Sequence, residues 1–279
     1  MKKVTLSLFK KKKKLHEKIT ALTAYDFPMA EILDRAGIDL ILVGDSVGMV
    51  LLGYSSTRYV TMDEMIHHAK AVRRGVRRAY LVGDMPYRSY QTPAVAYRNA
   101  CRFIEEAGCD AVKLEGGKSL LPVLRFFRKK KIVVQGHLGL LPQSVTPGSP
   151  FRIQAKDPLS AKTVIEEAHL LQEEGAFSII LECIPYEVAR FVTESLRIPT
   201  IGIGAGPFCD GQILVTHDLL GLFQKFKPRF VKSYASLSKS IDRAVSRYRG
   251  DVLHRTFPTL QHGFPMDPEA LRELRRALQ

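Results

Sequence analysis

The sequence predicts an α/β protein built as a (β/α)8 TIM barrel. From residue 19 onward, short apolar and β-branched runs alternate with longer amphipathic stretches, a pattern typical of βα units around a parallel sheet. Eight such runs occur, mostly one per ~30 residues, the usual length of a βαβ unit. The 279 residues of the chain suffice for a barrel, which typically takes about 250. An open doubly wound sheet is the alternative that this pattern leaves open.

The strands are predicted from runs that are nearly continuously apolar. Residues 40–43 and 178–181 are examples, and such runs are expected where both faces of a parallel strand are buried. Thr92-Pro93 and Asp157-Pro158 have the features of helix starts, and Gly108 and Gly175 those of helix ends. The eight predicted strands are residues 19–25, 40–45, 79–84, 111–115, 132–137, 178–182, 199–203 and 212–215.

Two segments lie outside the catalytic barrel, which we place at residues 19–262. Residues 1–18 form a lysine-rich basic N-terminal arm, and residues 263–279 form a C-terminal extension with a short helix over residues 268–278. The apolar run at residues 4–9 is too short for a signal peptide, and no run reaches the ~18 residues of a membrane span. We therefore expect a cytoplasmic protein that does not insert into a membrane.

The formal net charge of +14 raises the possibility of a nucleic acid or an anionic surface as partner. The lysines and arginines fall in runs with no interleaved aromatic residues, so we interpret them as solvated helix faces and expect no nucleic acid partner. The four cysteines form no C-x-x-C pair, which predicts free thiols in a reducing compartment.

Polar residues stand at the ends of five predicted strands, directly after apolar residues. In a parallel barrel the carboxyl ends of all strands meet at one mouth, where catalysis takes place. Residues distant in sequence are thus brought together there. The strand-end residues are Asp45 with Ser46, Asp84, Lys113 with Glu115, His137 and Glu182.

The acidic residues of this set predict a cation. Four carboxylates in one pocket, Asp45, Asp84, Glu115 and Glu182, would repel one another by several kcal/mol at an effective dielectric of about 20. A hard divalent cation, Mg2+ in preference to zinc, suits ligands that are all oxygen. Lys113 lies two residues from Glu115, on the same side of the strand, and neutralises part of the cluster.

Each of these residues also has a purely structural explanation. Asp and Glu at strand ends cap the following helix, and a single histidine is often a core residue. Two glycine-rich stretches, residues 116–117 and 202–206, suggest a phosphate cradle, but the first lacks the P-loop lysine and the second the dinucleotide spacing. The joint occurrence of carboxylates, a lysine and a histidine therefore carries the prediction.

Seven motifs, taken in order, resemble the ketopantoate (3-methyl-2-oxobutanoate) hydroxymethyltransferase family. The resemblance extends from about residue 5 to about residue 262. The motifs are ITALTAYD from Ile19, LVGDSVGM from Leu42, VKLEGG from Val112, GHLGLLPQSV from Gly136, LECIP from Leu181, IGIGAG from Ile201 and DGQILV from Asp210.

The resemblance implies a barrel of the phosphoenolpyruvate mutase and isocitrate lyase type that depends on Mg2+. It implies transfer of a hydroxymethyl group from 5,10-methylenetetrahydrofolate to 3-methyl-2-oxobutanoate in pantothenate synthesis. It makes Glu182 the catalytic proton acceptor. Metal binding falls on Asp45, Asp84 and Glu115, and substrate binding on Asp45, Ser46, Asp84, Lys113 and His137.

The resemblance also implies a homo-oligomer, a homodecamer, in which the arm before residue 19 docks on a neighbouring subunit. Two loops depart from the family pattern, at residues 55–59 and 146–156, and residues 263–279 match nothing in it. A lyase or mutase acting on another 2-oxoacid on the same barrel is the alternative enzyme. A nucleic-acid or membrane-surface binder is the alternative without catalysis.

Overall fold

Eight parallel strands close into a barrel in the computed structural model, which describes residues 2–146, 148–149 and 151–279. The strands follow chain order and β1 pairs with β8, so the predicted barrel is confirmed and the open sheet is excluded. The strands are β1 (Ile19–Thr23), β2 (Leu40–Val43), β3 (Tyr80–Asp84), β4 (Ala111–Glu115), β5 (Val134–Gly139), β6 (Ser178–Glu182), β7 (Thr200–Ile203) and β8 (Gly211–Leu214).

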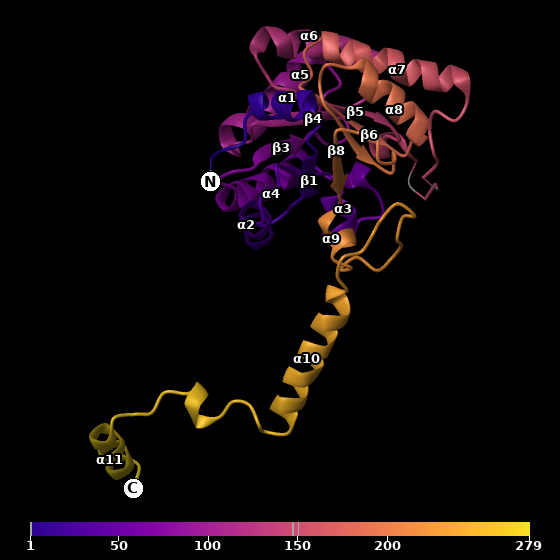
Figure 1. Cartoon of the computed structure of the whole chain (residues 1–279). Helices are drawn as coiled ribbons and strands as arrows, with labels where there is room; N and C mark the ends of the chain where they lie inside the picture. The colour runs from indigo at the N-terminus through magenta and orange to yellow at the C-terminus, as the bar shows by residue number, and fades with distance from the viewer. Residues whose placement is uncertain (1, 147, 150) are drawn as a thin grey trace.

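Helices cover most of the outside of the barrel (Figure 1). The connection from β7 to β8, residues 204–210, contains no helix, so the βα alternation expected from the sequence stops there. The covering helices are α2 (Phe27–Arg35), α4 (Met62–Gly75), α5 (Pro93–Cys101) with a π-helical turn (Arg102–Glu106), α6 (Leu121–Lys130), α7 (Pro158–Glu173) and α8 (Tyr186–Ser195). Shorter elements are α3 (Val47–Val50), α9 (Thr216–Leu219) and the 3-10 turns η1 (Thr57–Tyr59), η3 (Lys118–Leu120), η4 (Pro142–Ser144) and η5 (Leu260–His262).

The predicted helix boundaries at α5 and α7 are confirmed by their caps. The side chains of Thr92 and Asp157 accept hydrogen bonds from backbone N–H groups of the first turn, at 3.3 and 3.0 Å. Gly108 and Gly175 follow these helices with φ of +69° and +98°, in the left-handed region that glycine adopts without a steric penalty.

Strand β4 shows how the barrel separates its apolar core from its polar mouth. Val112 and Leu114 pack into the core between strands and helices, whereas Ala111 packs inside the barrel. Lys113 and Glu115 share the inner side with Ala111, as the period of two along a strand requires. The prediction that both point toward the mouth is therefore confirmed.

The first helix, α1 (Leu6–Lys14), lies against the amino-terminal end of its own barrel. Phe9 is 1% exposed, and its ring lies 5.4 Å from that of Tyr80 and 5.7 Å from that of Phe177, measured between centroids. The backbone N–H of Val4 donates to the carbonyl of Arg78 at 2.8 Å. The basic arm is thus a plug for its own barrel, and its docking on a neighbouring subunit stays a prediction.

Three lysines of this segment form ion pairs with aspartates beside the strand starts. Lys12 lies 2.6 Å from Asp39, and Lys13 lies 2.9 Å from Asp210. Lys3 lies 2.5 Å from Asp110, in a more exposed pair. The lysine run is therefore only partly a solvated charge run, because these pairs hold α1 on the barrel.

The carboxyl-terminal segment leaves the barrel. Helix α10 (Leu237–Leu253) extends away from it, and α11 (Pro268–Ala277) lies beyond, near the C-terminus (Figure 1). Neither helix contains a buried residue. Within the described ranges, no helix has the length and apolar character that crossing a membrane would require.

Replacing Phe9 with alanine should lower the free energy of unfolding by about 3–5 kcal/mol, the usual cost of truncating a buried phenylalanine. Urea denaturation followed by circular dichroism measures this loss. The control is Leu15→Ala, which truncates a side chain that is 51% exposed, and its effect should stay within about 0.5 kcal/mol. Equal effects for the two variants would show that the barrel does not depend on the plug.

Candidate active site

The strand-end residues singled out in the sequence all line one pocket at the mouth of the barrel. The pocket has a volume of about 1000 Å³. Five strands or the turns directly after them supply these side chains, so the predicted convergence is confirmed. The residues are Asp45, Ser46, Asp84, Lys113, Glu115, His137 and Glu182.

Lys113 is the central charge of this pocket. Its Nζ lies 2.7 Å from Asp84 Oδ1 and 3.5 Å from Glu115 Oε1, and its side chain is buried. Burial lowers the pKa of Lys113, but the carboxylates of Asp84, Glu115 and Asp45 outweigh burial and raise it above the ordinary value. Lys113 is therefore held as a cation.

The carboxylates respond differently to their surroundings. Burial raises the pKa of Asp45 well above its ordinary value, and the nearby charges of Asp84 and Glu115 raise it further. Burial also raises the pKa of Asp84, against the effect of Lys113. The pKa of Glu115 is lowered, because Lys113 and His137 overcome the effect of burial. Burial and like charge thus disfavour the ionised form of Asp45 and favour a proton or a cation on its carboxyl group.

His137 lies between two glutamates. Its Nδ1 is 3.2 Å from Glu115 Oε1 and its Nε2 is 3.1 Å from Glu182 Oε2, although neither approach has the angles of a hydrogen bond. Burial and Lys113 lower the pKa of His137, but the two carboxylates raise it to about 9. The imidazole is therefore positioned to hold Glu182 beside the rest of the cluster.

Gln143 connects three parts of the site. Its amide Nε2 donates to Asp45 Oδ2 at 2.9 Å and to the carbonyl of Met85 at 3.0 Å. Its backbone N–H donates to Glu115 Oε2 at 3.1 Å, and its Oε1 accepts from the Tyr90 hydroxyl at 2.6 Å. Neither Gln143 nor Tyr90 was predicted as a site residue, because neither ends a strand. The one available signal was the place of Gln143 in a motif shared with the family.

Ser46 is held by a tyrosine from the neighbouring strand end. Its hydroxyl shares a 2.7 Å hydrogen bond with the hydroxyl of Tyr25, which is 1% exposed. Burial raises the pKa of Tyr25 above its ordinary value, so the phenol stays protonated. Tyr25 was not predicted as a site residue, although it lies in the ITALTAYD motif.

The two loops that depart from the family pattern lie at this face of the barrel. Thr57 lines the mouth pocket, and Arg58 lines a separate cavity. In the second loop, Pro147 and Pro150 lie outside the described residues. Phe151 lines the pocket, and its ring centroid lies 6.5 Å from that of Phe226, so the described part of this loop forms one wall.

The glycine-rich stretches have structural explanations that need no phosphate. A Cβ on Gly206, where φ is +76°, would lie 2.3 Å from Cβ of Tyr186. A Cβ on Gly117 would lie 2.0 Å from the carboxyl carbon of Glu167, which accepts from the backbone N–H of Lys118 at 2.9 Å. A carboxylate of the chain itself thus takes the place that an anion would need, and the nucleotide-binding alternative loses its support.

The carboxylates of the pocket suit a cation that takes most of its ligands from water and substrate instead of from the protein. Within residues 2–146, 148–149 and 151–279, no three His, Cys, Asp or Glu side chains are arranged to bind one metal ion together. The oxygens of Glu115 face Lys113, His137 and the backbone N–H of Gln143, and those of Asp84 face Lys113 and the backbone N–H of Asp45. Metal binding by Asp45, Asp84 and Glu115 therefore stays a prediction. Mg2+ is commonly bound through one or two carboxylates, with water and substrate oxygens completing its shell. The two aspartates match that pattern.

Comparisons with known proteins agree on one family. A sequence model of the family described as ketopantoate hydroxymethyltransferase matches residues 3–260. The 3-methyl-2-oxobutanoate hydroxymethyltransferase of Syntrophomonas wolfei is 50% identical, covering 98% of this chain and 100% of that protein. The protein of the same name from Clostridium botulinum is 52% identical, covering 97% of this chain and 98% of that protein.

Solved structures with the same fold are much more distant in sequence. A phosphonopyruvate hydrolase in complex with oxalate and Mg++ aligns with a TM-score of 0.61 at 12% identity, covering 99% of this chain and 98% of that chain. A 2,3-dimethylmalate lyase of the PEP mutase/isocitrate lyase superfamily aligns at 0.56 and 15% identity, covering 98% and 96%. These likenesses place the barrel among folds of that type.

Replacing Asp218, on the pocket wall, with asparagine should change how stability depends on pH. Burial raises the pKa of Asp218 to about 6, above the ~3.9 of an unfolded chain. Ionisation therefore costs stability as pH rises from about 4 to about 6, and asparagine removes that cost. Unfolding midpoints are measured from pH 4 to pH 8. Between about pH 4 and pH 6, the midpoint of the variant should rise relative to that of the wild type. A constant difference between the two proteins would contradict the raised pKa.

Proposed function

This chain belongs to the ketopantoate hydroxymethyltransferase family, and from that premise we propose that it transfers a hydroxymethyl group to 3-methyl-2-oxobutanoate. The donor is 5,10-methylenetetrahydrofolate, and the product, 2-dehydropantoate, leads to pantothenate. The observation that carries the proposal is the convergence of the family-motif residues in one pocket, with Glu182 beside a buried cluster of Lys113 and three carboxylates.

The chemical difficulty is removal of the C3 proton, because a 2-oxoacid is far too weakly acidic at that carbon for a free carboxylate. A divalent cation bound by Asp45 and Asp84, for which we propose Mg2+, supplies Lewis acidity at the substrate oxygens. Lys113 adds fixed positive charge at the same place, and Ser46 offers a hydroxyl hydrogen bond. In this scheme Glu115 holds the cluster together, through Lys113 and the backbone of Gln143.

Glu182 takes the proton in this proposal. Its carboxylate stands at the end of β6, where His137 Nε2 lies 3.1 Å from Oε2 and limits its movement. As the C3–H bond breaks, its electrons shift toward the keto oxygen, which faces Lys113. Water adds to the methylene carbon of the folate and both of its C–N bonds break, which releases tetrahydrofolate and leaves the carbon as formaldehyde. The C3 carbanion then adds to this carbonyl carbon, and the resulting alkoxide takes up the proton held by Glu182 to give the hydroxymethyl group.

Replacing Glu182 with glutamine should abolish exchange of the C3 proton of 3-methyl-2-oxobutanoate with solvent deuterium, a reaction that needs no folate. The amide cannot accept the proton, while its shape preserves the pocket. Proton NMR of the substrate in D2O with Mg2+ follows the exchange, and a loss of at least ~100-fold is expected for removal of a general base.

The matched control is Glu187→Gln, which alters an exposed carboxylate on α8 that lines the same pocket. It should retain exchange within about twofold, since Glu187 is not at a strand end. A chelator should stop exchange by the wild type, and added Mg2+ should restore it. Wild-type protein that exchanges no C3 proton, or that turns over oxaloacetate instead, would refute the proposal.

We also propose that the protein forms a homo-oligomer, for which the family resemblance suggests ten subunits, and that α10 docks on a second copy. Exposed apolar side chains recur along one side of this helix, at Ile241, Val245, Tyr248 and Val252, with exposures of 42% to 58%. Such a stripe has the spacing of a helix face that packs against another element.

A cytoplasmic location is proposed as well. It is supported by four free cysteines, and cell fractionation would test it.

Sedimentation velocity tests the assembly directly. The full chain should sediment as an oligomer, and the double variant Val245→Lys/Tyr248→Lys should dissociate, because lysines on the stripe would bury charge. Ser240→Lys/Arg247→Lys, away from the stripe on the same helix, serves as the control and should leave the size unchanged. A monomeric wild type, or an unchanged stripe variant, would argue against the proposed docking.

A further inference from the structure

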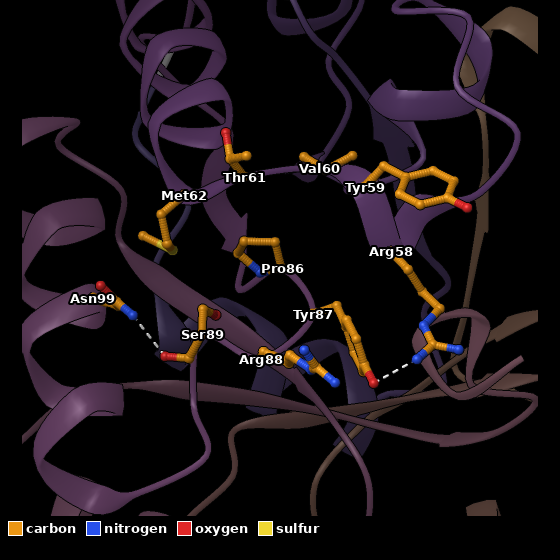
Figure 2. A pocket seen from close by; sticks show the side chains of 10 residues that line it. All are labelled: Arg58, Tyr59, Val60, Thr61, Met62, Pro86, Tyr87, Arg88, Ser89 and Asn99. Atoms are coloured by element: carbon orange, nitrogen blue, oxygen red, sulfur yellow. Dashed lines mark hydrogen bonds between the residues drawn. The ribbon is translucent and has the colours of Figure 1, made fainter. Parts of the chain in front are cut away.

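A second cavity opens beside the mouth pocket, between the loops after β2 and β3 and the start of α4 (Figure 2). Its volume of about 650 Å³ lies within the range of small-molecule sites. Two arginines, two tyrosines and several apolar side chains line it. The residues that matter for its chemistry are Arg58, Tyr59, Met62, Tyr87, Arg88 and Ser89.

Two guanidinium groups converge on one ring in this cavity. In Figure 2, Tyr87 lies between Arg58 and Arg88, and the Cζ atoms of the two arginines are 4.3 and 5.2 Å from the ring centroid. Arg58 Nη2 donates to the Tyr87 hydroxyl at 2.5 Å. The positive potential is strong enough that Arg88, and with it Arg58, lowers the pKa of Tyr87.

No carboxylate of the described residues forms an ion pair with either arginine. The two acids at the start of α4 are engaged elsewhere, since Asp63 pairs with Arg102 and Glu64 closes the capping box with Thr61. Ser89, which is 5% exposed, lines the same cavity with a hydroxyl that lacks a hydrogen-bond partner in the described chain. The cavity therefore offers cationic donors that the protein does not itself satisfy.

The cavity adjoins the active site along two loops, and no described residue lines both. Thr57 lines the mouth pocket and Arg58 the cavity, and Asp84 lines the mouth pocket while Pro86 lines the cavity. A ligand that reacts at the mouth could thus extend a charged end into the cavity. Of the two proposed substrates, only the folate has an anionic part remote from its reacting atoms, namely its glutamyl carboxylates.

We propose that this cavity is an anion subsite in which Arg58 and Arg88 bind the glutamyl carboxylates of the folate, with the tyrosines packing on the chain that carries them. This inference rests on the proposed function. Guanidinium groups bind carboxylates through paired N–H donors, and the ring of Tyr87 holds both groups in place. The subsite would favour folates with several glutamates over those with one.

Isothermal titration calorimetry with unreactive tetrahydrofolate tests the subsite without turnover. Wild-type protein should bind the triglutamate form about tenfold more tightly than the monoglutamate, the gain expected from ~1.4 kcal/mol of added charge-assisted contact. Arg58→Gln/Arg88→Gln should lose this preference, because neither form of the folate then meets the two guanidinium groups. Arg88→Gly should lose part of it while folding normally, because glycine easily adopts the φ of +66° found at this position.

The control is Arg74→Gln, an exposed arginine on α4 away from the cavity, which should keep the preference. The idea is overturned if the wild type does not discriminate, or if the double variant discriminates equally well. A further outcome would also overturn it. If the wild type shows no preference for the triglutamate, and inorganic phosphate raises the melting temperature of the wild type but not of the double variant, the cavity binds a free anion instead. Proton exchange without folate should be unchanged in all variants, and its absence from the wild type would instead count against the proposed function.

Discussion

The buried charge cluster at the mouth is the constraint on which the rest of the site depends. An uncompensated lysine in the barrel interior would cost several kcal/mol, so Lys113 requires Asp84 and Glu115 within reach. Strand register supplies that arrangement, because Asp84 stands opposite Lys113 and Glu115 opposite His137. A slip of one residue would turn these side chains out of the barrel. The buried charge cluster therefore requires this strand register, and the register in turn brings the charges together.

Much of the fold and the charged part of the site could be predicted, because both leave periodic or positional signals. Strand ends such as Asp84 and Glu182 follow apolar runs, and parallel strands must converge. Gln143 and Tyr90 left no such signal, since they reach the cluster from loops whose course depends on tertiary packing. Phe9 was missed for another reason: it ends a short apolar run before a lysine run, and its burial depends on Tyr80 and Phe177, far away in sequence.

Departures from the family pattern are concentrated outside the charge cluster. In the loop at residues 55–59, Thr57 lines the mouth pocket. Arg58 lines the adjoining cavity together with Arg88. The residues to which the family resemblance gives roles all line the mouth pocket. The departures thus lie in loops around the residues proposed for proton transfer. The division follows from the barrel, whose strands fix the chemistry and whose loops adjust what surrounds it.

The plug formed by α1 at the amino-terminal end of the barrel has a consequence for synthesis on the ribosome. Ile19 donates its backbone N–H to the carbonyl of Asp210 at 2.9 Å, and Lys13 pairs with the same aspartate, so the first strand needs the last. Translation of the intervening chain takes on the order of tens of seconds. Throughout that time one edge of β1 lacks its partner strand, and the ring of Phe9 lacks Phe177 until that residue has been added. The nascent chain is therefore a natural client for chaperones until its eighth strand emerges.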